Sequence, residues 1–153
     1  MRRAIVSALS QLGIPGMDGE HGRQVRLLRA LQESFLFSDQ ERALELVDQL
    51  DDYTNMHFLL EETLMIRRAY PGYQAHRQEH DHLIEELRRL RSAITSGGQA
   101  EGSTEADAIE QWLFRHIETF DRALATYLAH PSGQSEARFR DGAARLSRSS
   151  RRS

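Results

Sequence analysis

The sequence predicts an all-α protein, an antiparallel up-down-up-down four-helix bundle. Apolar residues recur every three or four positions in four successive segments, which is the period of an amphipathic helix. Short breaks rich in proline, glycine and serine separate these segments, so neighbouring helices should run in opposite directions. A length of 153 residues, 39% of them hydrophobic and 28% charged, suits one folded domain with a single core.

The first two helices are expected over residues 22–37 and 39–68. Three glycines and a proline within residues 13–19 should block regular structure, so the first helix should begin near Gly22. Its apolar face carries Val25, Leu28, Leu31 and Phe35. Ser38-Asp39 offers an N-cap for the second helix. The inward stripe of this helix is expected to carry Leu46, Leu50, Tyr53, His57, Leu60 and Leu64.

The third and fourth helices should follow the break at Tyr70-Pro71-Gly72. The third helix carries on one face His76, His80, Leu83, Leu87, Leu90 and Ile94. A glycine-rich loop is expected over residues 96–103, with Thr104 capping the fourth helix. The face of the fourth helix comprises Ile109, Trp112, His116, Phe120, Leu124 and Tyr127. This helix should end near His130-Pro131.

The bundle should occupy residues 1–131, and residues 132–153 read as a disordered Arg/Ser-rich tail. The tail contains six arginines and two carboxylates and so has a net charge of +4. Because the whole chain has a net charge of −3, the residues before the tail have a net charge of −7. This balance argues against nucleic acid as the main partner, while the basic tail could make a weak contact with an acidic protein. We expect a monomer.

The N-terminal run Ala4 to Leu9 is too short and too polar for a signal peptide, and no apolar stretch is long enough to span a membrane. These features predict a cytoplasmic protein. The absence of cysteine excludes disulfides, thiolate zinc sites and iron–sulfur clusters. Any metal must therefore be bound by nitrogen and oxygen.

Seven side chains of this kind lie in register with the apolar stripes. They are His21, His57, Glu61, His76, His80, His116 and Asp121. Residues four positions apart on a helix are separated by about 40° around its axis, so His57 with Glu61 and His76 with His80 can each present two ligands at one depth. The pattern predicts a metal site in the core of the bundle.

His116 and Asp121 are five residues apart, which would separate them by about 140° on an ideal helix. For both to reach one site, the backbone between them should be locally widened, as in a π-bulge. We therefore predict a wide turn at this point.

Seven strong donors exceed what one ion usually takes and suit two octahedral ions that share carboxylates. Oxygen-activating diiron enzymes use two Glu-x-x-His motifs, whereas here the only one is Glu79 to His82. A site rich in histidine is less anionic and favours reversible binding over oxidation of substrates. The donor types also suit manganese, cobalt or zinc, so spacing alone does not select the metal.

The combined pattern resembles the hemerythrin family, in particular its bacterial single-domain members, over residues 13–128. The matching motifs are Gly13-Ile14 with Asp18-x-x-His21, His57-Phe58-x-x-Glu61-Glu62-x-Leu64-Met65, Tyr70-Pro71, His76-x-x-x-His80 and Trp112-Leu113-x-x-His116-Ile117-x-x-x-Asp121. Many bacterial relatives carry an aromatic-rich segment before the first ligand, and Met1 to Leu12 contains no aromatic residue. The mouth of the site could therefore be more open here.

The resemblance implies two non-haem irons bridged by an oxo or hydroxo group. The first iron would be bound by His76, His80 and His116 and would be coordinatively filled. The second would be bound by His21 and His57, with a position open for dioxygen. Both irons would share Glu61 and Asp121 as bridges. An apolar oxygen pocket would be lined by Phe58, Trp112 and Leu113.

The function implied is that of an oxygen carrier, store or delivery protein rather than an enzyme. Two alternatives remain open: an oxygen or redox sensor, and a diiron enzyme that handles peroxide or nitric oxide. The three pocket residues could equally be ordinary core, and Met65 reads as core filler. Glu62 reads as a solvated neighbour of Glu61. His82 and His130 are not assigned to the metal site.

Overall fold

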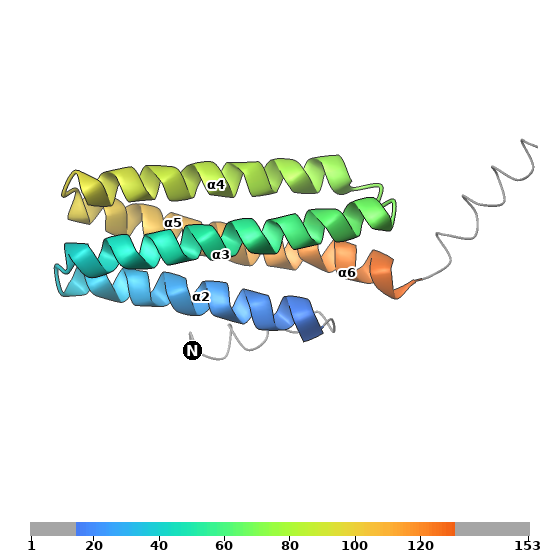
Figure 1. Ribbon diagram of the computed structural model, residues 1–153, viewed down its shortest axis with the longest axis horizontal. Helices are drawn as coiled ribbons and strands as arrows, with labels where there is room; N and C mark the ends of the chain where they lie inside the picture. Colours follow the sequence, from blue (N-terminus) through green and yellow to red (C-terminus); the bar gives the residue numbers. More distant parts are fainter. Residues whose placement is uncertain (1–14, 131–153) are drawn as a thin grey trace, which may run out of the picture.

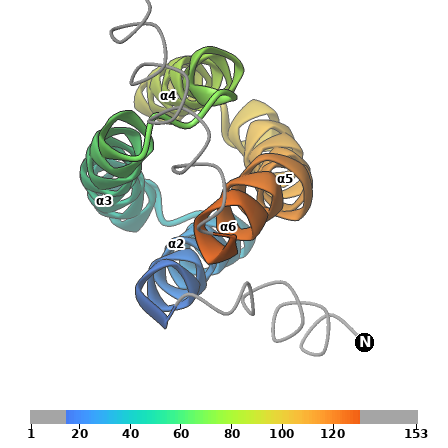
Figure 2. The same ribbon diagram turned by 90° about the vertical axis from the view of Figure 1, so that its right-hand side faces the viewer.

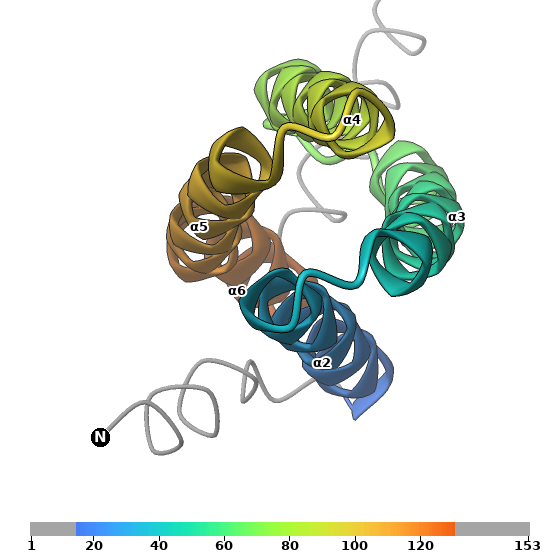
Figure 3. The same cartoon turned by 90° about the vertical axis from the view of Figure 1, so that its left-hand side faces the viewer.

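The computed structural model describes residues 15–130, which form a bundle of helices with no strand in that range (Figure 1). The elements are α2 (Pro15–Leu36), α3 (Gln40–Arg67), α4 (Tyr73–Thr95), α5 (Gln99–His116), the π-helical turn η1 (Ile117–Asp121) and α6 (Arg122–Ala129). Seen end-on, α5 and α6 make one rod that closes a ring with α2, α3 and α4 around a single core (Figures 2 and 3). The predicted fold class is confirmed.

The predicted tail over residues 132–153 lies outside the described residues, so its disorder and the domain boundary at 131 stay predictions. The last described helix ends at Ala129, just before the predicted end. Among the described helices, none has the length and apolar character needed to cross a bilayer.

The predicted apolar faces of three helices form the core. Val25, Leu28, Leu31 and Phe35 of α2 are all at most 9% exposed. Leucines of α4 and the inward residues of α5 join them in one continuous cluster. A second, smaller cluster of Met65 and Leu124 covers the end of the bundle where α3 turns into α4. Met65 is therefore core, as expected.

The start of the first helix was predicted too late. α2 begins at Pro15 and passes through Gly16 and Gly19. Proline suits the first turn of a helix, because the N–H that it lacks would have no intrahelical partner there. Each glycine costs only about 1 kcal/mol in a helix interior, so the rest of a long helix can outweigh it.

The loop predicted over residues 96–103 is also wrong, because α5 begins at Gln99 after a short turn in which Gly97 has φ +78°. The Gln99 side chain donates a hydrogen bond to the carbonyl of Phe35, tying α5 to the end of α2. Residue 102 lies inside this helix and is a glycine that packs closely against α2, since a Cβ there would come within 3.1 Å of the Phe35 ring. The Thr104 hydroxyl donates to the Ala100 carbonyl, so it is a mid-helix residue and not a cap.

The inward stripe of α3 differs from the prediction at three positions. Leu60 is 53% exposed, and Tyr53 and Leu64 are half-buried. Their places in the core are taken by Phe58, Glu61 and Met65. Polar Glu61 is inward because the interior beside it is polar, and apolar Leu60 is displaced to the surface. Asp39 does cap this helix, accepting from the backbone N–H of Arg42 at 3.0 Å.

Candidate metal centre

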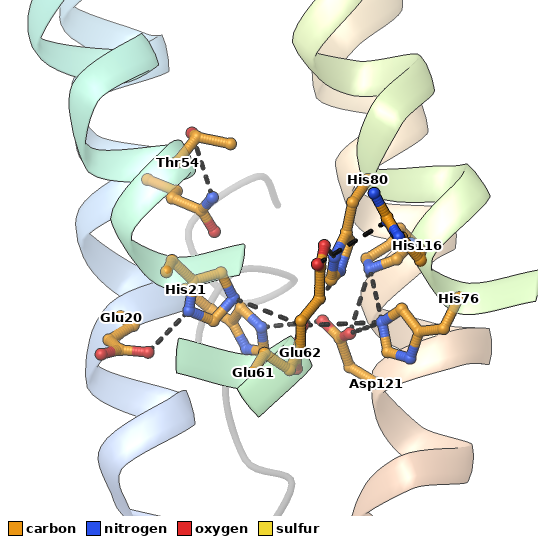
Figure 4. A network of polar contacts seen from close by, with 12 residues as sticks. Glu20, His21, Thr54, Glu61, Glu62, His76, His80, His116 and Asp121 are labelled. Atoms are coloured by element: carbon orange, nitrogen blue, oxygen red, sulfur yellow. Dashed lines mark hydrogen bonds and ion pairs between the residues drawn. The ribbon is translucent and has the colours of Figure 1, made fainter. Parts of the chain in front are cut away.

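All seven side chains predicted as metal ligands meet in the core of the bundle (Figure 4). Each is at most 4% exposed. α2 contributes His21, α3 contributes His57 and Glu61, α4 contributes His76 and His80, α5 contributes His116 and η1 contributes Asp121. The helices α2 to α5 and the turn η1 therefore each present at least one donor to the same buried volume.

Five of the seven form a crowded group: Glu61, His76, His80, His116 and Asp121. One ligand atom from each lies within 4.8 Å of all the others. Nε2 of His76 and Nε2 of His116 each lie 3.0 Å from Oδ1 of Asp121, and Nε2 of His80 lies 3.0 Å from Oε2 of Glu61. Three imidazoles and two carboxylates thus point at one centre.

A sparse group lies beside it, made of His21, His57 and the same Asp121. Nε2 of His21 lies 2.8 Å from Oδ2 of Asp121, whereas the crowded group faces Oδ1. The Glu61 oxygen Oε2 lies 4.0 Å from Nε2 of His57 and 3.6 Å from Nε2 of His76. Both carboxylates therefore lie between the two groups of histidines, which is the arrangement that bridging ligands need.

The wide turn predicted between His116 and Asp121 is present. Residues Ile117–Asp121 form η1, and the backbone N–H of Arg122 donates to the carbonyl of Ile117, five residues back. A turn of this kind holds more residues than an α-helical turn, so the fifth residue returns to the face that the fourth would otherwise occupy. Asp121 reaches the centre for this reason.

Two carboxylates outside the centre fix histidine rings within it. Oε2 of Glu20 lies 2.6 Å from Nδ1 of His57, and Oε1 of Glu62 lies 3.0 Å from Nδ1 of His80. When a carboxylate accepts a hydrogen bond from Nδ1–H, the ring keeps its proton on Nδ1, and the lone pair of Nε2 is free to bind a metal. The interpretation of Glu62 as a solvated neighbour is therefore wrong, because its side chain is only 22% exposed and contacts a ring.

The sequence analysis did not identify Glu20. The signal available was its place directly before His21 on a helix that runs antiparallel to the one carrying His57. An acidic residue beside one ligand can reach the ring of another ligand on the neighbouring helix. Spacing within a single helix does not reveal such a contact.

The donor set fits a metal because the buried polar atoms have too few partners of their own. Both oxygens of Glu61 and of Asp121 are buried and make no well-directed hydrogen bond within the described residues, and the same holds for Nε2 of His80. Nε2 of His76 and Nε2 of His116 lie 3.2 Å apart. If both rings are neutral and carry their proton on Nδ1, the lone pairs of the two Nε2 atoms point toward each other and repel. Buried groups in this state are costly, and a cation between them would satisfy all of them.

The electrostatics of the cluster favour an ionised Asp121 and a neutral His116. Burial by itself would raise the pKa of Asp121, but close contacts with His116, His21 and His76 outweigh it and hold that pKa well below the usual range. Burial lowers the pKa of His116, which favours the neutral imidazole. Burial also acts to lower the pKa of His80, but Glu61 and Glu62 beside it raise it above the ordinary value. The pKa shifts of Asp121 and His116 favour the forms that bind a metal, an anionic carboxylate and a neutral imidazole, whereas a metal would compete with the proton that the raised pKa favours on His80.

Aromatic rings pack directly on the histidines of the crowded group. The Phe58 ring stacks on His80 with centroids 3.7 Å apart, and the Trp112 ring stacks on His116 at 4.7 Å. Phe120, which was predicted only as core, stacks on His116 at 5.5 Å. These contacts restrict ring rotation and keep the face of the centre apolar.

The residues predicted to line an oxygen pocket, Phe58, Trp112 and Leu113, are each at most 6% exposed and belong to the main core cluster. Both interpretations of these residues, as pocket lining and as ordinary core, therefore stay open. Trp112 also forms part of a surface hollow with His82 and Phe120, so its outer edge reaches toward solvent.

A buried polar pair lies one helical turn from the sparse group. The Gln24 side-chain amide donates to the Thr54 hydroxyl at 3.2 Å, and both residues are at most 1% exposed. Gln24 lies three residues after His21 and Thr54 three residues before His57 on antiparallel helices, so both lie to the same side of those ligands. The amide oxygen of Gln24 is buried without a hydrogen bond in the described structure. Neither Gln24 nor Thr54 was predicted from the sequence to be buried or to lie near the centre.

The two remaining histidines lie apart from the cluster. The side chain of His82 is 55% exposed, with Nε2 3.9 Å from Oε1 of Glu86. Nδ1 of His130 lies 2.9 Å from the carbonyl of Thr126 at the end of α6. Both positions agree with their exclusion from the predicted ligand set.

Comparison with known proteins gives the family. A sequence model described as "Hemerythrin HHE cation binding domain" matches residues 12–128, which is most of the chain. The chain belongs to the hemerythrin family. The resemblance inferred from the motifs is therefore confirmed, and the match includes all seven clustered side chains.

Several named relatives of this hemerythrin chain are bacterial. Bacteriohemerythrin of Pseudomonas paraeruginosa is 29% identical over 118 residues, covering 77% of this chain and 76% of the relative. Bacteriohemerythrin of Stenotrophomonas maltophilia is 30% identical over 114 residues, covering 74% of each. Myohemerythrin of Sipunculus nudus is 32% identical over 75 residues, covering 49% of this chain and 57% of the relative. No solved structure matches the chain.

Proposed function

We propose that this chain binds dioxygen reversibly at a centre of two iron ions. The observation that carries the proposal is the uneven distribution of donors around two shared carboxylates. The crowded group offers three imidazoles and the sparse group two, while Glu61 and Asp121 lie between them. Five donors nearly fill an octahedral ion, whereas four leave room for a further ligand.

The assignment of residues follows from this distribution. His76, His80 and His116 would hold one iron, and His21 and His57 would hold the other. Glu61 and Asp121 would bridge them, because each lies close to histidines of both groups. The match to the cation-binding family supports a metal at this place. A pair of ferrous ions held there would supply the two electrons that reversible reduction of dioxygen requires.

The remaining residues of the centre position the ligands and exclude water. Glu20 and Glu62 accept the Nδ1 protons of His57 and His80, which fixes both rings with Nε2 inward. Phe58 and Trp112 cover ring faces of the crowded group. A dry surrounding disfavours loss of reduced oxygen to solvent, which is the reaction that a reversible binder must avoid.

The visible spectrum tests the proposal. Reduced, iron-loaded protein should be colourless under argon, develop a charge-transfer band on exposure to air and lose it again under vacuum. Iron analysis should give two ions per chain. Direct formation of a stable oxidised spectrum on the first exposure to air would contradict reversible binding and favour a sensor or an enzyme.

Stopped-flow kinetics separates the proposal from the enzymatic alternative. A carrier should release oxygen many times before it oxidises irreversibly. Rapid turnover with peroxide or nitric oxide, at rates above that of oxygen release, would show that catalysis is the main activity.

A further inference from the structure

An apolar stripe runs along the outer face of α3, directly behind the metal ligands that this helix presents inward. Its four members are 53–63% exposed: Met56, Leu59, Leu60 and Ile66. At 100° per residue they lie within about 120° of one another, on the side of the helix opposite the buried residues. Large side chains gathered in this way differ from the scattered exposed hydrophobic residues of ordinary surfaces.

Charged residues of opposite sign lie at the two ends of the stripe. Asp52 is exposed at the end nearer the N-terminus of α3, and Arg67 is exposed at the other end. Within residues 15–130 neither makes an ion pair, although many surface charges of this bundle do. The stripe therefore has a negative end and a positive end, both without a partner in the described structure.

We propose that this stripe, Asp52 to Arg67 of α3, is the contact surface of a homodimer in which two copies of α3 pack antiparallel. In an antiparallel pair centred between Leu59 and Leu60, a residue of one copy lies opposite the residue of the other copy for which the two residue numbers add up to 119. Leu59 of one copy then faces Leu60 of the other, and Met56 faces Thr63. Asp52 faces Arg67 at both ends of the seam. Parallel packing would instead bring identical charges together.

The self-complementarity selects a second copy of this chain as the occupant. A two-fold contact requires each patch to match itself after rotation, and both the charges and the leucines of α3 meet that condition. The antiparallel arrangement also aligns the helix dipoles favourably. One helix face is smaller than the roughly 800 Å² per partner of a standard interface, so the dimer should be weak, with a dissociation constant of roughly 10 to 100 μM. This inference departs from the expected monomer.

The rim of the stripe is already occupied by contacts within the chain. Arg23 of α2 lies over the Tyr53 ring, 4.7 Å from its centroid, and Arg77 of α4 lies 4.0 Å from Glu62. These residues fix the borders of the exposed face without covering it. The proposal does not depend on which metal is bound or on oxygen binding.

Sedimentation equilibrium of the full-length, metal-loaded chain over a range of concentrations tests the dimer. The wild-type protein should pass from monomer to dimer as its concentration rises through the dissociation constant. Asp52→Arg and Arg67→Glu should each weaken the dimer at least about tenfold, because each places like charges together at both ends. A mixture of the two variants should form a heterodimer about as tightly as the wild type. In that heterodimer the introduced arginine faces the introduced glutamate at one end, and Asp52 faces Arg67 at the other.

Recovery in the mixture excludes misfolding as the cause of the loss. Phe37→Ser, which removes an exposed apolar side chain between α2 and α3, is the matched control and should leave the dimer unchanged. A wild-type chain that stays monomeric at millimolar concentration would overturn the proposal. So would dimerisation that survives both single charge variants, because another surface would then be responsible. If the full-length chain stays monomeric and a chain lacking residues 1–14 dimerises, the N-terminal segment covers the stripe of α3 and the proposal is wrong.

Discussion

The crowded and sparse groups of the centre share Asp121 and lie on either side of Glu61, and they differ in their number of donors and in their surroundings. Around the crowded group, Phe58, Trp112 and Phe120 stack on imidazole rings. Beside the sparse group lies the buried hydrogen bond between Gln24 and Thr54. One half of the centre is held tightly by donors and aromatic packing, whereas the other has fewer donors and a polar neighbour.

Under the proposed function, this difference would give two metal ions separate roles. The crowded half would hold a structural ion that stays in place. The sparse half, with fewer donors, would leave a position for an exogenous ligand. Four predictions test the difference between the two groups, in order from the largest expected effect to the smallest.

Removal of metal should have the largest effect. With limiting chelator, the ion of the sparse group should leave first, because it has four protein donors against five. Complete removal should lower the free energy of unfolding by about 4 kcal/mol or more, as expected when ligand exceeds its dissociation constant a thousandfold. Metal analysis and urea unfolding at each stage check this. Release of both ions in a single step would contradict the asymmetry.

Replacement of one histidine should have different effects on metal binding in the crowded and in the sparse group. His116→Ala removes a ring from the crowded group and leaves Asp121 less compensated, so the free energy of unfolding should fall by about 3 to 5 kcal/mol with loss of metal. His21→Ala should retain the ion of the crowded group. His82→Ala, which changes an exposed histidine, is the control. Equal metal loss in the first two variants would show that the centre binds metal as one unit.

The outer carboxylates should tune each ion separately. Glu62→Gln weakens the support of His80, and Glu20→Gln weakens that of His57. Each change should reduce the affinity of its own ion by about 10-fold to 100-fold, with little effect on the other ion. Competition titration with a metal-binding dye measures both constants. If both variants weaken the same ion, the assignment of the groups is incorrect.

The polar pair beside the sparse group should have the smallest effect. Gln24→Leu combined with Thr54→Val replaces the pair by apolar side chains of similar shape and removes the buried amide oxygen that lacks a hydrogen bond. The free energy of unfolding of the metal-free chain should rise by about 1 kcal/mol. Urea unfolding provides the value. A fall of similar size would mean that the pair has a further partner and stabilises the bundle.

Much of the fold and of the centre could be predicted from periodicity. The apolar faces of α2 and α4 and six of the seven clustered side chains followed from their spacing in predicted helices, whereas His21 precedes the first predicted helix and was matched through the family motif. Even the wide turn followed, because a spacing of five between His116 and Asp121 is incompatible with an α-helix and one centre. Local spacing determines these features.

Several of the errors came from contacts between helices, whereas the late start predicted for α2 had the local cause given above. Gly102 was read as part of a loop, but it lies inside α5, where it packs closely against the Phe35 ring of α2. Leu60 is exposed because a buried polar centre draws Glu61 inward in its place. Glu62 and Glu20 act on rings carried by other helices. None of these contacts is encoded in the spacing of a single segment.

The four carboxylates of the centre also determine its electrical balance. Glu61 and Asp121 lie inside it, and Glu20 and Glu62 contact its histidines from outside, so their formal charge is −4 when all are ionised. Two divalent cations would neutralise this charge, whereas two trivalent cations would leave an excess of two in a buried volume. In the low-dielectric interior such an excess is costly unless a further anion joins it. If the centre holds the two ions proposed above, its carboxylates would therefore favour a divalent pair, and oxidation of that pair would be accompanied by uptake of an anion.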